Sequence, residues 1–159
     1  MSAFVRSVNV GQPRVVAWRG EAVATGIFKS SVSGPVRVSF LNIAGDGQAD
    51  LSVHGGRDKA VYAYPFEHYL FWRTIFADRE LPWGQFGENL TTEGLLEDDV
   101  RVGDRFRIAT ASFEVTQPRI PCFKLGITFD DQRMVKRFLE SRRTGFYLRV
   151  ISEGELAAG

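Results

Sequence analysis

The only cysteine of the chain, Cys122, lies in a short segment that is rich in proline and positive charge. Pro118 and Pro121 stiffen the backbone before it, and Arg119 and Lys124 place a cation on either side of the thiol. Nearby positive charge favours the thiolate, which is the form that attacks electrophiles and binds soft metals. The alternative interpretation is a small buried hydrophobic residue, which is the commoner role of a single cysteine.

A second segment with chemical potential contains His54, Gly55 and Gly56, followed by Lys59. The alternation of apolar and polar residues over 49–53 predicts a strand that ends at the histidine. Paired glycines let the backbone approach a ligand closely, and the N–H groups of such a turn can bind an anion, with the lysine adding a point charge. The alternative is a plain turn whose histidine and lysine face solvent.

A third segment, residues 85–94, packs amides, hydroxyls and glycine between apolar residues and is predicted to be a loop. Its Asn89 and Thr91 could donate hydrogen bonds to a polar heterocycle. They could equally cap turns, which Asn and Thr do routinely.

The sequence lacks the residues that several common chemistries require. With only His54 and His68, a multi-histidine metal centre lacks ligands, and the second of these is predicted to be structural within a helix. No nucleotide-binding Gly-x-x-x-x-Gly-Lys-Ser/Thr loop and no Gly-x-Ser-x-Gly elbow is present. A hydrolase pair of Cys122 with His54 would need the two side chains within hydrogen-bond reach.

Composition predicts one soluble domain over residues 1–159 in a reducing compartment, with the cytoplasm as the expected location. The 20 cations and 19 anions leave a net charge of +1, which gives no bulk attraction to nucleic acid or to a membrane surface. One cysteine cannot form an internal disulfide. No apolar run approaches the roughly 18 residues that span a bilayer, and the N-terminus does not resemble a secretory signal.

Strand patterns dominate the chain, so the predicted fold is mostly β, a barrel or sandwich. Glycine-bearing breaks, Gly126 among them, separate the strands. Apolar and polar residues alternate with period two over 36–40, 105–108, 113–116 and 146–150, more weakly over 23–27, and the sheet is expected to begin at 5–10.

Two helices are expected to interrupt the strands. The first spans 65–77 with Pro65 at its first helical position, and its apolar residues lie nearly all round, so it should be mostly covered. The second spans about 131–143, with Asp130 or Asp131 as its cap and Gly145 after its end.

Taken together and in order, these segments resemble the MOSC domain, the C-terminal domain of molybdenum cofactor sulfurases, which also occurs in standalone bacterial proteins. The resemblance covers roughly residues 25–150 and is closest to the small bacterial members that reduce N-hydroxylated bases such as 6-hydroxylaminopurine. The segments that carry it are Gly47-Gln48-Ala49-Asp50, Val53-His54-Gly55-Gly56, Lys59-Ala60-Val61-Tyr62, Phe86-Gly87-Glu88-Asn89-Leu90, Gln117-Pro118-Arg119-Ile120-Pro121-Cys122 and Thr144-Gly145-Phe146-Tyr147-Leu148-Arg149-Val150.

The resemblance implies a MOSC-type β-barrel with two or so helices and one molybdenum cofactor of the molybdopterin type. Cys122 would be the molybdenum ligand and the catalytic residue, and Arg119 and Lys59 would meet the phosphate or the pyranopterin edge. The remaining cofactor-binding residues would be His54, Gly55, Gly56, Asn89, Thr91 and Gln117. Pyridoxal phosphate binding is a further expectation attached to the family.

The implied activity is reduction of a small N-hydroxylated substrate, with electrons from a separate donor protein, because no flavin or iron–sulfur motif is visible. One alternative is a carrier that transfers the cofactor, or a persulfide on Cys122, without turnover. Another is a barrel adapted to protein interaction. The resemblance also implies two differences from the small bacterial members: the helical C-terminal module that they often contain is expected to be absent, and residues 127–131 are more acidic than their counterpart.

Overall fold

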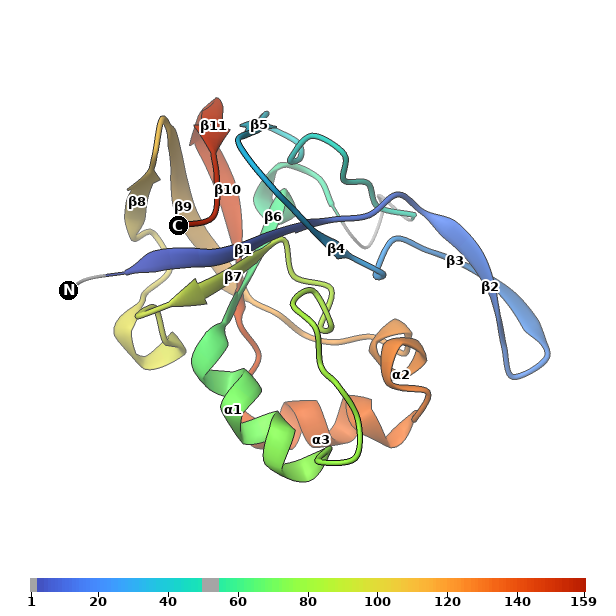
Figure 1. Cartoon of the computed structure of the whole chain (residues 1–159). Helices are drawn as coiled ribbons and strands as arrows, with labels where there is room; N and C mark the ends of the chain where they lie inside the picture. The colour runs from blue at the N-terminus through green and yellow to red at the C-terminus, as the bar shows by residue number, and fades with distance from the viewer. Residues whose placement is uncertain (1–2, 50–54) are drawn as a thin grey trace.

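The computed structural model describes residues 3–49 and 55–159, and its body is one curled seven-stranded sheet with helices gathered at one end (Figure 1). Among these strands, β6 and β7 pair in parallel and every other named pair is antiparallel. In sheet order the strands are β4 (Ser30–Val32), β1 (Phe4–Val10), β7 (Leu90–Glu93), β6 (Val61–Pro65), β10 (Phe146–Ser152), β9 (Ala111–Pro118) and β8 (Arg105–Ile108).

Two short two-stranded sheets accompany the body. Strand β11 (Gly154–Leu156) pairs with β5 (Val36–Val38), and β2 (Arg14–Trp18) pairs with β3 (Glu21–Thr25) in a ribbon that projects from the body (Figure 1). The helices are α1 (Phe66–Ile75), α2 (Lys124–Phe129) and α3 (Arg133–Ser141), with 3₁₀ turns η1 (Arg57–Lys59) and η2 (Glu97–Asp99). Of the helices described, none has the length and apolarity needed to cross a membrane.

The mostly β fold is confirmed, and so are the strands that alternation predicted. Strand β8 has the predicted bounds, while β1, β9 and β10 contain the predicted ranges and extend them. Strand β5 ends at Val38 and β3 at Thr25, each two residues before the end of the apolar alternation. The predicted strand before His54 lies, from residue 50 onward, outside the described residues.

Two apolar clusters form the core. The first lies inside the curled sheet and is built from aliphatic residues and phenylalanines of its strands, such as Val8, Leu90 and Phe113. The second is aromatic and joins the helices to β6, with Trp72 of α1, Phe138 of α3 and Tyr64 of β6 all buried. Burial of apolar area stabilises each by about 25 cal/mol per Å² removed from water.

The two predicted helices exist, but their details differ from the expectation. Helix α1 begins at Phe66, and Pro65 is its N-cap and the last residue of β6, not the first helical residue. The prediction that this helix is mostly covered was wrong: Leu70 is 52% and Ile75 43% exposed, because only one side packs on the aromatic cluster. Helix α3 begins at Arg133 and its N-cap is Gln132, not the predicted Asp130 or Asp131, although the Arg133 backbone N–H donates to Asp131 Oδ1 at 2.9 Å.

Several elements were not predicted, among them β2, β4, β6, β7 and α2. Residues 90–93 form β7 in the middle of the sheet, not a loop, since its residues are buried on both faces and give no alternation. Helix α2 spans Gly126, where a break was expected. A Cβ on this glycine would lie 3.1 Å from Gln132 Cα, so the absent side chain lets α2 pack against the turn before α3.

Candidate functional site

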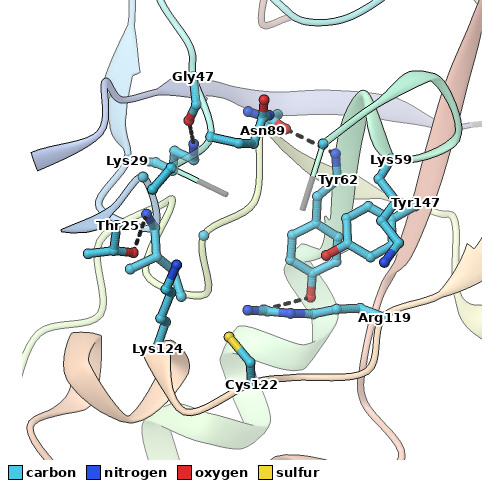
Figure 2. Close-up of a pocket in the computed structure, with 16 residues that line it drawn as sticks. Thr25, Lys29, Gly47, Lys59, Tyr62, Asn89, Arg119, Cys122, Lys124 and Tyr147 are labelled. Carbon is cyan, nitrogen blue, oxygen red and sulfur yellow. Dashed lines mark hydrogen bonds between the residues drawn. The ribbon is translucent and has the colours of Figure 1, made fainter. Parts of the chain in front are cut away.

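A hollow of about 570 Å³, a volume that includes the open solvent at its mouth, lies between the sheet and the start of α2 (Figure 2). Its wall comes from segments far apart in the sequence: the end of β3, the turns around residues 47–49 and 87–89, the start of β6, strand β10, and the connection from β9 to α2. Its lining residues are Thr25, Gly26, Ile27, Lys29, Gly47, Gln48, Ala49, Gly55, Lys59, Tyr62, Gly87, Asn89, Arg119, Cys122, Lys124 and Tyr147.

Cys122 lies half-buried in this wall, in the turn that leads into α2. The backbone N–H of Leu125 donates to the Cys122 carbonyl at 3.1 Å, so the first turn of the helix fixes the position of the cysteine backbone. Figure 2 shows the sulfur directed into the hollow, below Arg119 and beside Lys124. The thiol is therefore accessible from the hollow and lies among cations, as the sequence predicted.

Arg119 is only 6% exposed, and its guanidinium is held by neutral oxygens. Nη1 donates to the Tyr62 hydroxyl at 3.2 Å and to the Phe86 carbonyl at 2.5 Å, and the guanidinium carbon lies 4.7 Å from the Tyr62 ring centre. Burial acts to lower the pKa of Arg119, but the nearby Tyr62, Tyr147 and Cys122 raise it above the ordinary value overall. The side chain is therefore charged at every physiological pH.

Two tyrosines form the aromatic side of the hollow, with ring centres 5.2 Å apart. Burial raises the pKa of Tyr62 far above its ordinary value, and burial likewise raises that of Tyr147. Both phenols are therefore neutral hydrogen-bonding groups. The Tyr62 hydroxyl donates to the Thr144 carbonyl at 2.5 Å, and Lys59 Nζ lies 5.6 Å from the Tyr147 ring centre.

The turn at Gly145 positions both Arg119 and Tyr62. Its carbonyl accepts the Arg119 backbone N–H at 3.3 Å, and its own N–H donates to Glu97 Oε2 at 2.7 Å. A Cβ at this position would lie 2.4 Å from the Ala63 carbonyl oxygen, so glycine is required. His68 Nε2 lies 2.7 Å from Glu97 Oε1, which gives this histidine the structural role that the sequence predicted.

On the other wall, Lys29 forms a buried ion pair. Its Nζ lies 2.6 Å from Asp46 Oδ1, and the two side chains are 6% and 0% exposed. The same carboxylate oxygen accepts the Gly11 N–H at 3.1 Å, and Oδ2 accepts from Gln48 Nε2 at 3.4 Å. The charge of Lys29 is therefore balanced within the protein.

The segment Phe86-Gly87-Glu88-Asn89 forms a buried polar network behind the hollow. Asn89 Oδ1 accepts the Tyr62 N–H at 3.0 Å, and Glu88 accepts from Tyr69, Thr91 and the Phe86 N–H. Complete burial raises the pKa of Glu88 to about 6, although these hydrogen bonds act to lower it. Thr91 is fully buried in this network and does not line the hollow.

The structure brings together five of the residues that the sequence analysis proposed for the site. These are Gly55, Lys59, Asn89, Arg119 and Cys122, all on the wall of the hollow. Gly56, Thr91 and Gln117 do not line it: Gly56 is the N-cap of η1, and Gln117 is a half-buried residue of β9 paired with Tyr147. His54 lies outside the described residues.

Sequence reasoning missed other lining residues. Tyr62 and Tyr147 belong to segments that carried the family resemblance, so their position in those motifs was an available signal. Lys124 was recognised as a cation near the cysteine but was not assigned to the site. Lys29 follows no pattern that distinguishes it from a surface lysine, so no signal could have found it.

The described side chains do not form a metal-binding cluster by themselves. Within residues 3–49 and 55–159, no group of three or more His, Cys, Asp or Glu side chains could hold a metal ion.

Comparison with known proteins agrees with this architecture. The MOSC domain family matches residues 50–159, more than half of the chain. The protein YflK of Bacillus subtilis is 46% identical over 155 residues, which cover 98% of this chain and 70% of YflK. The chain belongs to the MOSC domain family.

Two further comparisons concern structure and naming. The crystal structure of YiiM from Geobacillus stearothermophilus superposes with a TM-score of 0.80 at 36% identity and covers 99% of this chain and 72% of that one. A Gibberella moniliformis protein named "Reductase" is 34% identical over 96% of this chain, which spans only 27% of it. The MOSC-type fold is thereby confirmed, and a named reductase is among the relatives.

Proposed function

We propose that this MOSC protein binds a molybdenum cofactor of the molybdopterin type in the hollow and reduces small N-hydroxylated compounds. The observation that carries the proposal is the position of Cys122, half-buried on a wall that also contains the buried guanidinium of Arg119 and the ammonium groups of Lys59 and Lys124. A soft thiolate among cations suits a metal held within an anionic cofactor.

The residues present fit such a group. Its dithiolene sulfurs would supply the metal ligands that the described side chains lack, so that one thiolate completes the set. Arg119 can donate to a phosphate or to a pterin edge, since neutral oxygens leave its charge uncancelled. The backbone of Gly55 lies on the same wall, where it permits close approach.

When bound, the cofactor supplies two-electron redox chemistry at its metal. Reduction of an N–OH group consumes two electrons and two protons, breaks the N–O bond, and releases an amine and water. Lys59 and Lys124 place N–H donors and positive charge on the wall, and the neutral Tyr62 and Tyr147 rings orient a flat substrate. The electrons would come from a separate donor protein.

The experiment that tests the proposal compares wild type with Cys122→Ser, each expressed in cells able and unable to make molybdopterin. We expect molybdenum in wild type from competent cells only. We also expect benzamidoxime reduction to fall at least about 100-fold in the variant, more than the loss of an outer-shell partner costs. Metal-free wild-type protein from competent cells, or equal activity of the variant, would refute the proposal.

A second candidate function, transfer of the cofactor or of a persulfide on Cys122, is favoured by one observation. Phe123, which directly follows the cysteine, is 52% exposed, so a partner protein can reach this segment. Cyanide-labile sulfur on wild-type protein, or bound cofactor without turnover, would support transfer over reduction. Pyridoxal phosphate binding and a cytoplasmic location stay predictions.

A further inference from the structure

Two large apolar side chains are exposed on the segment that holds Cys122. Ile120 is 77% and Phe123 52% exposed, although the residues next to them, Arg119 and Pro121, are buried. The backbone that carries them is fixed by Pro121 and by the first turn of α2, where the Gly126 N–H donates to the Phe123 carbonyl at 2.9 Å. Exposed apolar residues that are grouped and rigidly held are typical of a protein interface.

Positive charge is concentrated in the same part of the chain. Residues 119–143 contain seven cations and three anions, a net charge of +4, whereas the other residues contain 13 cations and 16 anions, a net charge of −3. Exposed cations of α3 and its C-terminal end contribute, among them Lys136, Arg137 and Arg142. Helices α2 and α3 follow the cysteine segment directly and lie together at the helical end of the molecule (Figure 1).

Local ion pairs cancel only part of this charge. Arg133 pairs with Asp131 at 3.0 Å, and Lys136 lies 3.7 Å from Glu140 in a highly exposed pair. Exposed pairs are weak, so these two pairs leave residues 119–143 with an excess of cations. Ile120 and Phe123 come directly before α2, which packs against the cation-rich α3, so apolar and basic surface lie on neighbouring elements. This combination is complementary to a partner that carries both an apolar patch and carboxylates.

We propose that Ile120 and Phe123, together with the basic surface of α3, form the docking surface for an electron-transfer protein with an acidic face. The inference rests on the proposed reductase function, because a donor must bring its own cofactor close to Cys122, and these two residues flank it. A symmetric contact between two copies of this chain is disfavoured, since it would place two positive surfaces against each other.

The test uses the double variant Ile120→Ser/Phe123→Ser and the matched control Val15→Ser/Leu70→Ser, whose residues are 69% and 52% exposed on β2 and α1. Neither Ile120 nor Phe123 lines the hollow, so the site is left intact. Benzamidoxime reduction is measured with reduced methyl viologen, a small donor, and with reduced flavodoxin, an acidic flavin protein. Titration calorimetry measures flavodoxin binding directly, without turnover.

We expect the methyl viologen rate of the double variant to stay within about twofold of wild type, because the chemistry is untouched. The flavodoxin KM and Kd should both rise about tenfold or more, as the loss of interface anchors predicts, and the control should match wild type. Arg137→Glu/Arg142→Glu should slow flavodoxin association and weaken its dependence on salt.

Other outcomes would overturn the docking surface. One is a flavodoxin KM and Kd that are unchanged in the double variant. Another is wild-type protein that turns over with methyl viologen but accepts electrons from neither flavodoxin nor plant-type ferredoxin. A dimer that the variant dissociates in sedimentation would assign the patch to a second copy, and lost binding to vesicles containing phosphatidylglycerol would assign it to a membrane. If wild type shows no turnover with methyl viologen but flavodoxin binding is still weakened in the double variant, the reductase function is refuted and the docking surface is supported.

Discussion

Lys29 and Arg119 lie on facing walls of the hollow (Figure 2), and both place a charged side chain out of water: the Lys29 side chain is 6% exposed, and Arg119 as a whole residue is 6% exposed. Their surroundings differ in one respect. Lys29 Nζ lies 2.6 Å from the carboxylate of Asp46, whereas the guanidinium of Arg119 contacts a hydroxyl and a carbonyl. Among the described residues, no carboxylate lies within ion-pair distance of Arg119.

The difference separates a structural cation from one that is available to a ligand. A buried charge is costly unless it is paired, and neutral oxygens satisfy hydrogen bonds without cancelling charge. The protein tolerates that cost at Arg119 on the wall that also holds Cys122. An anionic ligand there would supply the missing countercharge, whereas at Lys29 the countercharge is already present.

The largest expected effect comes from removing Lys29. Lys29→Met should lower the free energy of unfolding by about 3 kcal/mol, because it leaves the Asp46 carboxylate buried without its cation. Arg119→Met should change it by less than about 1 kcal/mol, since the lost hydrogen bonds are offset by removal of a buried unpaired charge. Urea denaturation of both variants measures the two values.

The exposed pair Arg6–Glu93, at 2.8 Å and with side chains 36% and 30% exposed, provides the surface control. Arg6→Met should cost less than about 1 kcal/mol. Equal destabilisation by Lys29→Met and Arg119→Met would contradict the distinction between the two walls.

Glu88 is a third buried ionisable group, and its contribution to stability should depend on pH. Its folded-state pKa of about 6 exceeds the ordinary 4.5, so between these values the folded protein retains a proton that the unfolded chain has released. The contribution of Glu88 to the free energy of unfolding is fully present below pH 4.5 and is lost as the pH rises through 6. The loss is about 2 kcal/mol, from 1.36 kcal/mol per pKa unit.

Glu88→Gln should remove that dependence while the Tyr69 and Thr91 hydroxyls still hydrogen-bond the side chain. The measurement is the difference in unfolding free energy between wild type and variant from pH 4 to pH 7. A difference that stays constant over this range would show that the carboxyl does not titrate as its burial requires.

The smallest expected effect is anion binding by the wild-type protein. Pyrophosphate at about ten times its Kd should stabilise the fold by about 1.4 kcal/mol and raise Tm by about 3–5 °C. Arg119→Met should abolish the shift, and Arg6→Met should preserve it. An undiminished shift in Arg119→Met would show that the buried guanidinium is not the anion-binding group.

Much of the fold was predictable because half-buried strands alternate. Strands such as β8 and β10 have one face in the core, so their pattern showed in the sequence. The central strands β6 and β7 are buried on both faces and carry no such alternation, so β7 was mistaken for a loop. Helix α2 was missed because a buried glycine, Gly126, looks like a break when its close neighbour is unknown.

The residues of the candidate site likewise include some that the sequence predicted and others that it did not. The presence of Cys122 and Arg119 on the hollow was predictable because both lie in one short proline-rich segment with a recognisable family pattern. Thr91 was placed in the site because a loop was expected where the structure has a buried strand. The pairing of Lys29 with Asp46 joins two turns that are 17 residues apart, and no local pattern indicates such a contact.

The position of β7 beside β1 has a consequence for the synthesis of the protein. Val8 pairs with Leu90, 82 residues later, so at about 5–20 residues per second the ribosome needs several seconds to deliver this partner. The contacts of β1 with β4 can form earlier because they span about 20 residues. The other edge of the first strand must remain unpaired in the nascent chain for that interval, exposed to association with neighbouring chains.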